Sequence, residues 1–368
     1  MTNQKASLRK LLTNPVLLNI ILVLVLLHLV FGGLYLARSF LVPLTVAAFL
    51  AMLLVPVSNG LQKIGSPRVL ASFICSFIVL VFFASMGIVM GYQISRVAQD
   101  SEKIEQKVSQ KVQEARNYIQ QQYGLSRQEQ KQVTGGDASL VSSVFKKAQG
   151  LLSNTFAMLS DLLLIVVYVF LFVHYRNHIS TFVQKLVKPP YRQGAANTLV
   201  QASKVARKYL YGRLIIILIL WGAYYLGFAL TGLKYAMFLS FTAAFLSIIP
   251  YLGNIIGGGA AILFALINNP GASTALLVLT VLTVAQLLES YLLTPLIMGE
   301  EIKINAMFTI VGIILGGALW GIPGLILAVP AIGILKVLFD NLEVLNPWSF
   351  LISDTGEGGT LSGIFKKK

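Results

Sequence analysis

The sequence is poor in charge and in cysteine. Only 12% of its 368 residues are charged, while 56% are hydrophobic and the mean hydropathy is +0.77. This balance excludes an ordinary soluble domain and indicates a polytopic membrane protein. Cys75 is the single cysteine, so neither a disulfide framework nor a cysteine metal site can form within one chain.

Several catalytic signatures are also absent. The sequence has no Gly-x-x-x-x-Gly-Lys-[Ser/Thr] phosphate loop, no His-Glu-x-x-His and no Gly-x-Ser-x-Gly. We therefore expect no enzyme activity, no cofactor and no bound metal. The formal charge of +15 does not indicate nucleic-acid binding, because the basic residues lie between apolar runs, as in the cytoplasmic loops of membrane proteins.

Six apolar runs are long enough to cross a bilayer, for which about 20 residues suffice. They predict an all-α membrane protein with six full spans at residues 15–36, 40–57, 69–92, 156–175, 214–230 and 272–298. Residues 1–92 then form an N-terminal three-span region, and residues 156–231 a pair of spans joined by the loop 176–213. That loop has eight basic and no acidic residues, which places it in the cytoplasm, together with both chain termini and the tail 341–368.

Two further apolar runs are interrupted by proline and glycine, at 250–254 within 235–268 and at 321–324 within 305–339. Each arm has about 14–16 residues and is too short to span comfortably. Non-helical backbone at membrane depth is tolerated only where protein or water surrounds it, and paired interruptions are typical of transporter binding regions. We predict two opposed re-entrant hairpins, with two short full spans in each run as the alternative. Residues 232–340 would form the transport core.

The segment 93–155 differs from the rest because it is polar, with nine basic and six acidic residues between 93 and 154. Apolar residues recur at spacings of three and four, which is typical of an amphipathic helix. A turn signal follows at 134–137. The segment is predicted to form a helical hairpin outside the membrane, although either half fits a helix on the membrane surface equally well. The apolar positions of its first half are Ile104, Val108, Val112, Ala115 and Ile119.

Glu289 is the only carboxylate in the run 272–298. A carboxylate within the membrane costs about 2.5–3.5 kcal/mol on insertion scales, so it normally faces a cavity or a partner. We predict that Glu289 binds a solute or ion or exchanges a proton, beside a polar stripe that includes Thr283, Gln286 and Ser290. The alternative is a carboxylate at a subunit contact.

The interruptions are the second group of candidate site residues. Pro250, Gly253 and Asn254 predict a tight tip whose carbonyls and amide contact the solute or ion, since proline removes a donor and glycine permits positive φ. The other proline and glycine candidates are assigned to hairpin tips and close helix packing, in part through glycines four residues apart. They are Gly257, Pro295, Gly299, Gly316, Gly317, Gly321, Pro323, Gly324 and Pro330.

Three stretches carry a family resemblance: Ile-Pro-Tyr-Leu-Gly-Asn at 249–254, the segment 286–299 around Glu289, and the segment 316–330. Together they resemble the AI-2E (autoinducer-2 exporter) family of bacterial membrane proteins. The sequence departs from the family pattern at Asn254, where proline is frequent, and at Ser290, where asparagine is frequent. The resemblance implies a homo-oligomeric transporter of the bacterial inner membrane, with a pentamer as one fitting arrangement and membrane lipids as its surroundings.

Three functional hypotheses follow. The first is a secondary transporter that exports a small polar organic solute, with autoinducer-2 as the solute that the resemblance implies and H⁺ or Na⁺ as coupling ion. The second is a Na⁺(Li⁺)/H⁺ antiporter, motivated by a membrane carboxylate near amide and hydroxyl oxygens. The third is a membrane scaffold that recruits a partner through residues 93–155.

Overall fold

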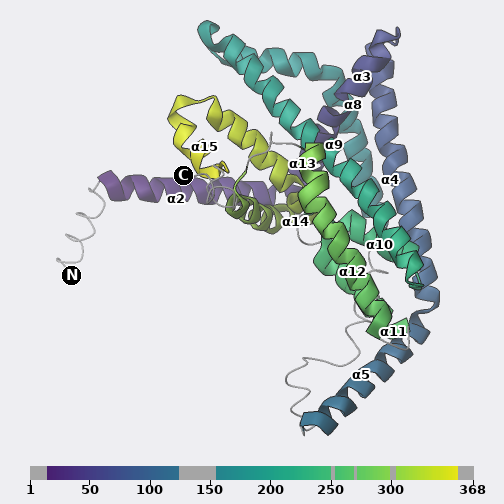
Figure 1. Ribbon diagram of the computed structural model, residues 1–368. Helices are drawn as coiled ribbons and strands as arrows, with labels where there is room; N and C mark the ends of the chain where they lie inside the picture. The colour runs from purple at the N-terminus through teal and green to yellow at the C-terminus, as the bar shows by residue number, and fades with distance from the viewer. Residues whose placement is uncertain (1–14, 124–154, 250–252, 269–271, 299–303, 355–368) are drawn as a thin grey trace, which may run out of the picture.

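The computed structural model describes residues 15–123, 155–249, 253–268, 272–298 and 304–354. Within these residues all regular secondary structure is helical, and no β-strand forms. Figure 1 shows long helices running side by side, with α2 projecting to one side. The prediction of an all-α polytopic membrane protein is confirmed.

Among the described residues, seven helices are long and apolar enough to cross a membrane. Six of them contain the six predicted full spans. The seventh, α14 (Ala306–Asp340), is the second interrupted run. The six are α2 (Pro15–Leu36), α3 (Arg38–Lys63), α4 (Arg68–Gln99), α8 (Thr155–Leu186), α9 (Arg192–Leu230) and the unit Ala272–Met298.

The predicted loop 176–213 is helical along most of its length, which corrects the sequence interpretation. Helix α8 continues to Leu186, and α9 begins at Arg192 after the 3₁₀ turn Pro189–Tyr191. The chain turns at Pro189 and Pro190 because neither residue has an N–H to donate. A high basic charge therefore indicated where the segment lies relative to the membrane, but not that it lacks regular structure.

The first half of the predicted polar hairpin is helix α5 (Ser101–Tyr123), which follows α4 after Asp100. Ile104, one of the predicted apolar positions, is buried against Tyr235, Phe238, Phe264 and Ile267. Residues 124–154 lie outside the described residues, so the hairpin itself stays a prediction.

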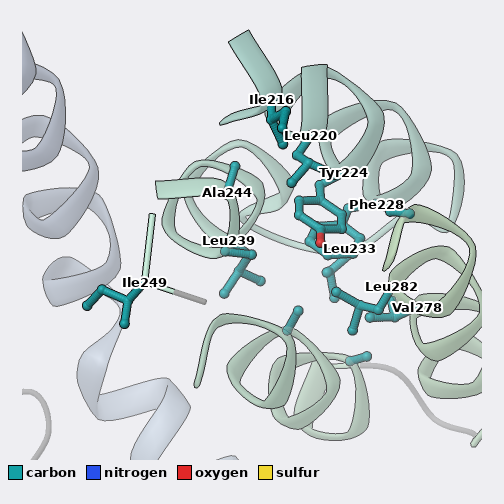
Figure 2. Close-up of a cluster of buried hydrophobic side chains, with 14 of the residues drawn as sticks. Ile216, Leu220, Tyr224, Phe228, Leu233, Leu239, Ala244, Ile249, Val278 and Leu282 are labelled. Atoms are coloured by element: carbon teal, nitrogen blue, oxygen red, sulfur yellow. The ribbon is translucent and has the colours of Figure 1, made fainter. Parts of the chain in front are cut away.

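Helix α9 is the centre of the molecule, in contact with α3, α8, α10, α12, α13 and α14. Its buried residues recur every three or four positions, the period of one helix face. Figure 2 shows this face meeting side chains of α10 (Ala236–Leu246) and α12 (Ala272–Leu288). The rings of Tyr224 and Phe228 stack at 5.8 Å between centroids. The face comprises Tyr209, Ile216, Leu220, Tyr224 and Phe228.

The first interrupted run folds back on itself. Helix α10 is followed by a π-helical turn, Gly253–Gly258, and then by α11 (Gly259–Asn268). A Cβ at Gly253 would overlap the backbone of Ser247, and one at Gly257 would overlap that of Ala243. Only glycine permits such close contact between the two arms.

The second interrupted run also folds back, because α14 consists of two helical arms that meet at a kink at Gly321. Gly321 has φ 62° and ψ −139°, a conformation that side chains other than glycine rarely adopt. On either side of it the arms touch, because a Cβ at Gly316 would lie 2.5 Å from the carbonyl oxygen of Gly324. Both runs are thus helical hairpins in shape, and their re-entrant course through the membrane stays a prediction.

Candidate functional site

Glu289 is paired with Arg213 inside the protein. Arg213 Nη1 donates to Glu289 Oε1 at 2.7 Å, and each side chain is only 10% exposed. Two isolated charges at this depth would each be strongly destabilising, so each depends on the other. The sequence interpretation counted Arg213 among the charges of the loop 176–213 and missed this role. The available signal was its place directly before the apolar run 214–230.

The backbone around Glu289 departs from the α-helix. Residues Glu289–Leu293 form a π-helical turn between α12 and α13 (Thr294–Met298). Pro295 supplies a cause, because its ring would clash with the carbonyl of the residue four positions earlier in a regular helix. A π turn widens the helix at that point and is frequent at functional sites. Proline therefore shapes the turn that presents the carboxylate.

The predicted polar stripe does not share the face of Glu289. Thr283 and Ser290 are exposed, and Thr283 Oγ1 donates to the carbonyl of Leu279 at 2.8 Å. Gln286 Nε2 donates to Ser290 Oγ at 2.9 Å. Each helical residue advances about 100°, so positions 283 and 290 are turned away from the buried face that ends at Glu289, and the half-buried Gln286 lies at the edge of that face. The sequence interpretation placed Glu289 beside this stripe, and a role of the stripe in binding a solute or ion stays a prediction.

The described part of the first predicted tip contacts α9. Tyr224 donates its hydroxyl to Asn254 Oδ1 at 2.7 Å, while Gly253 is buried against Ser247. Pro250 lies outside the described residues. The side-chain amide of Asn254 is thus hydrogen-bonded within the protein. Its partner, Tyr224, lies on α9, the helix that also supplies Arg213.

Several residues assigned to tips and packing lie at contacts between helix arms. Gly316 and Gly324 touch through their backbones, and a Cβ at Gly317 would lie 2.6 Å from Leu325 Cδ2. Pro330 is fully buried, and Pro295 is exposed within α13. Gly299 lies outside the described residues. These positions agree with packing, and no described contact gives them another role.

A cavity of about 880 Å³ lies beside the ion pair. It is bordered by α3, α4, α8, α9 and by both hairpins, with Ile248 next to α10 and Ile322 and Pro323 at the bend of α14. Arg213 lines this cavity, whereas Glu289, its hydrogen-bond partner, is not among the lining residues. A solute in the cavity would therefore be next to Arg213 rather than next to Glu289.

Two donors near the cavity lack a partner. Arg213 Nε and Trp221 Nε1 are buried, with no hydrogen-bond acceptor among the described residues. A buried donor left unsatisfied costs roughly 1–3 kcal/mol, so such groups commonly mark a site for a ligand or an ion. Within the described part of the chain, no three His, Cys, Asp or Glu side chains gather as metal ligands.

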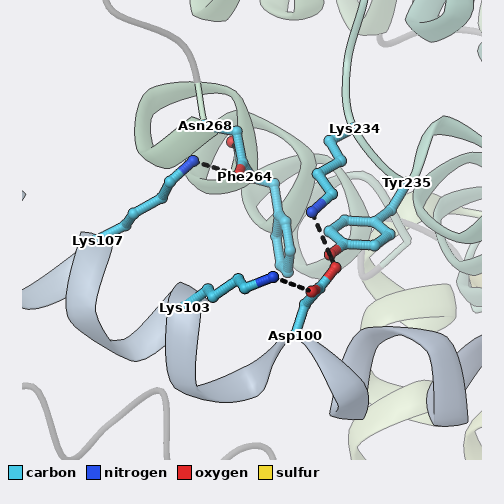
Figure 3. A network of polar contacts seen from close by, with 7 residues as sticks. All are labelled: Asp100, Lys103, Lys107, Lys234, Tyr235, Phe264 and Asn268. Atoms are coloured by element: carbon cyan, nitrogen blue, oxygen red, sulfur yellow. Dashed lines mark hydrogen bonds and ion pairs between the residues drawn. The ribbon is translucent and has the colours of Figure 1, made fainter.

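A polar network holds the α4–α5 junction against the first hairpin (Figure 3). Asp100 accepts hydrogen bonds from the Tyr235 hydroxyl and from Lys234 Nζ, the latter at 2.9 Å. At the other end of the hairpin, Lys107 Nζ donates to Asn268 Oδ1 at 3.3 Å. The hydrogen bonds from Tyr235 and Lys234 lower the pKa of Asp100 to about 2. Sequence reasoning did not predict this network, because its members are more than 100 residues apart.

The profile described as "AI-2E family transporter" matches residues 20–343. The chain belongs to the AI-2E transporter family. Its relatives include the protein YueF of Bacillus subtilis (strain 168), 28% identical over 195 residues, a match that spans 52% of each chain. YrrI of the same organism is 25% identical over 312 residues, covering 82% of this chain and 86% of the relative. The AI-2 transport protein TqsA of Escherichia coli (strain K12) is 23% identical over 337 residues, 92% of this chain and 96% of its own.

Membership in this family and seven membrane-length helices make the protein a multi-pass membrane transporter. The resemblance read from the three sequence stretches is confirmed. The solute, the coupling ion and the orientation belong to the proposal that follows.

Proposed function

We propose that the protein is a secondary transporter that exports a small polar organic solute through the cavity beside Arg213. The observation that carries this proposal is the buried Arg213–Glu289 pair at the wall of a cavity that both hairpins border. Autoinducer-2 is the first candidate solute, because AI-2 is the solute in the printed name of TqsA.

The ion pair gives the transporter a means of coupling to protons. When Glu289 binds a proton, Arg213 loses its counter-charge and becomes available to a solute in the cavity. When the proton leaves, the carboxylate competes for the guanidinium again. A ligand shifts a conformational equilibrium only through its different affinity for the two states. Making and breaking this pair supplies such a difference at a point next to both hairpins.

The location is proposed to be the bacterial inner membrane, with both termini in the cytoplasm. The basic segment 176–213 supports this orientation. We also propose a homo-oligomer in the lipid bilayer. Helix α2 has no buried residue, and its main contacts within the described part of the chain are with α3 and α14, so most of its apolar surface is left for lipid or for a second copy.

The contacts of Glu289 give the antiporter hypothesis less support than its sequence surroundings do. It was motivated by hydroxyl and amide oxygens around Glu289, and hard cations prefer a shell of such oxygens. Among the described contacts, the carboxylate instead meets the guanidinium of Arg213, while Gln286 and Ser290 bond to each other. A bound cation at Glu289 would have to displace Arg213.

Flux in proteoliposomes tests the proposal. Purified protein should release labelled autoinducer-2 down an imposed proton gradient, and Glu289→Gln should reduce that flux at least tenfold at equal protein levels. Glu343→Gln is the matched control, because Glu343 is exposed in a short 3₁₀ turn remote from the cavity lining. Equal flux in wild type and Glu289→Gln would refute the coupling role of Glu289.

The same vesicles separate the other hypotheses. Sodium-dependent proton movement without solute flux would support the antiporter. If the protein causes no flux of any solute or ion, the scaffold is the hypothesis that remains. Deleting residues 98–150 should abolish the function of a scaffold, whereas a transporter would keep its flux.

A further inference from the structure

The cavity beside Arg213 has mainly apolar walls and few polar groups. Its charged lining residues are Arg38 and Asp161, which are exposed, and the buried Arg213. We propose that this cavity binds amphipathic organic anions, with the carboxylate of the ligand at Arg213 and its apolar body along α9 towards Trp221. This inference rests on the transporter function proposed above, but for the solute of this cavity it favours an amphipathic anion over the polar autoinducer-2.

The two unpartnered donors determine what the head group must be. Arg213 Nε and the indole Nε1 of Trp221 are N–H donors that accept nothing, so a ligand that satisfies them must offer acceptor oxygens or nitrogens. A carboxylate is the acceptor that a guanidinium binds best, through short charge-assisted hydrogen bonds. Arg213 donates from Nη1 to Glu289. Its Nε has no partner among the described residues, so a ligand could accept from it.

The spacing of the donors determines the length of the ligand. Arg213, Ile217 and Trp221 line the cavity at intervals of four residues, so they follow one face of α9. Eight residues of helix rise about 12 Å. A ligand that binds at Arg213 and extends about 12 Å along the helix thus reaches Trp221, whereas a shorter one has its carboxylate at Arg213 and its apolar body directed towards Trp221. A cavity of about 880 Å³ accommodates a body of that size.

The walls determine the body of the ligand. Five phenylalanines from three helices surround the space, and burying a ring against them contributes more than any further hydrogen bond available there. One of them, Phe241, packs edge-on against Trp221 with 5.7 Å between ring centroids. An aromatic or long aliphatic body therefore fits better than a sugar-like one. The five are Phe49, Phe82, Phe83, Phe241 and Phe245.

A membrane lipid offers the same combination of an apolar chain and an anionic head, so the source must be decided. A phosphate head group is usually held by several converging donors. The cavity offers the guanidinium of one buried arginine, which is already paired with Glu289, and one indole N–H, and its exposed charges, Arg38 and Asp161, are of opposite sign. These groups fit a monocarboxylate that enters the cavity as a solute for transport.

Glu289 acts as an internal competitor for the ligand. Its carboxylate is paired with the guanidinium that the ligand needs, although Glu289 itself does not line the cavity. Neutralising Glu289 should therefore strengthen anion binding, whereas removing the guanidinium should weaken it. A merely structural ion pair would give weaker binding or none in both cases.

The test uses full-length protein in phosphatidylcholine nanodiscs and radiolabelled 1-naphthaleneacetate, an aromatic monocarboxylate. We expect saturable binding that Glu289→Gln tightens about tenfold and that Arg213→Gln weakens about 10- to 100-fold. The double variant Arg213→Gln/Glu289→Gln keeps the pair uncharged, so it reports loss of binding even if the single Arg213 variant does not fold. Trp221→Phe should weaken binding about fivefold.

Matched controls separate the cavity from general effects. Arg207→Gln removes a guanidinium from the same helix outside the cavity lining, and Trp348→Phe alters an exposed indole, so neither should change binding. Neutral 1-naphthaleneacetamide should compete at least tenfold less well than the acid. Equal competition by the amide, or full binding in the double variant, would overturn the proposal.

Two further outcomes are decisive. If phosphatidylglycerol added to the nanodiscs displaces the label and remains bound at saturating 1-naphthaleneacetate, the site is a lipid site and the proposal is wrong. Binding without transport of 1-naphthaleneacetate or any other solute would refute the transporter function and leave the cavity chemistry intact. Glu289-dependent flux of another solute without this binding would refute the cavity chemistry alone.

Discussion

The two hairpins are similar in sequence pattern but are held in different ways. The first, α10 with α11, is hydrogen-bonded to other parts of the chain, through Asn254 to α9 and through Asn268 to α5. The second, α14, is closed mainly by contacts between its own glycines. Its bend region has one hydrogen bond to a neighbour, from Trp320 Nε1 to the carbonyl of Leu34 in α2 at 3.1 Å.

This difference indicates separate ways of fixing an interrupted membrane helix. Directional hydrogen bonds fix the position of the first hairpin relative to its surroundings. Close packing fixes the shape of the second and leaves its position to apolar contacts, which are not directional. Because both hairpins border the cavity, changes in either should reach the solute, but through different physical effects.

The largest expected effect is from steric overlap, in either hairpin. Gly324→Ala and Gly253→Ala each place a Cβ into the backbone of the opposite arm. Backbone atoms cannot rotate away, so we expect each change to cost about 3 kcal/mol or more, at the upper end of overpacking effects. Thermal unfolding of the purified protein measures this loss. Gly259→Ala is the control, since nothing lies within 4 Å of its new Cβ and alanine favours helix.

The second effect concerns the ion pair between Arg213 of α9 and Glu289. Arg213→Gln alone leaves a buried carboxylate without a partner, which should cost about 3 kcal/mol, at the lower end of the usual penalty for an uncompensated buried charge. The double variant Arg213→Gln/Glu289→Gln should recover most of this loss. A double-mutant cycle on unfolding midpoints measures the coupling. Equal losses in the single and double variants would show that the pair contributes no coupling energy.

A smaller effect separates the hairpins directly. Tyr224→Phe removes the hydroxyl that donates to Asn254, which should cost about 1 kcal/mol and loosen the first hairpin only. Hydrogen–deuterium exchange should rise in α11 and stay constant in α14. Tyr225→Phe is the control, because Tyr225 is 42% exposed on the same helix. Increased exchange in both hairpins would show that they are not independently held.

The smallest effect is that of pH on Asp100. Its pKa in the folded protein is about 2, below the ordinary value of 3.8. A lowered pKa stabilises the folded form above the ordinary value, and this contribution disappears as pH falls from about 4 to about 2. Proteolysis near the α4–α5 junction should increase over that range, and Asp100→Asn should remove the pH dependence. Glu102→Gln, at an exposed position two residues from Asp100 with no bond to the network among the described residues, should keep it.

The sequence predicted those features that have a local cause. Gly321 and Gly253 mark the bends because no other residue fits them, and a lone carboxylate in an apolar run draws attention to Glu289. The partner of that carboxylate was missed because Arg213 is 76 positions away and follows a basic segment. Charge counting treats such a residue as a topology signal, and only packing of α9 on α12 reveals the pair.

The exposure of Thr283 and Ser290 has another physical origin. Polarity in a membrane helix suggests a binding face, but the face of α12 that is buried in the protein consists of small and apolar residues such as Ala285 and Leu282. A difference of one position rotates a side chain by about 100°. The π turn at Glu289 was not predicted. It could have been inferred from Pro295, because the ring of a proline disturbs the regular helix over the four residues before it.

Under the proton coupling that we propose, the Arg213–Glu289 pair would also determine how transport responds to membrane voltage. Intact, the pair is a short dipole without net charge, and a transmembrane field exerts little force on it. Once Glu289 is protonated, a full positive charge remains on α9, and moving such a charge across the bilayer is worth about 2.3 kcal/mol per 100 mV. Flux should thus depend on an imposed potassium diffusion potential in the wild type at low pH, and much less where the pair stays intact.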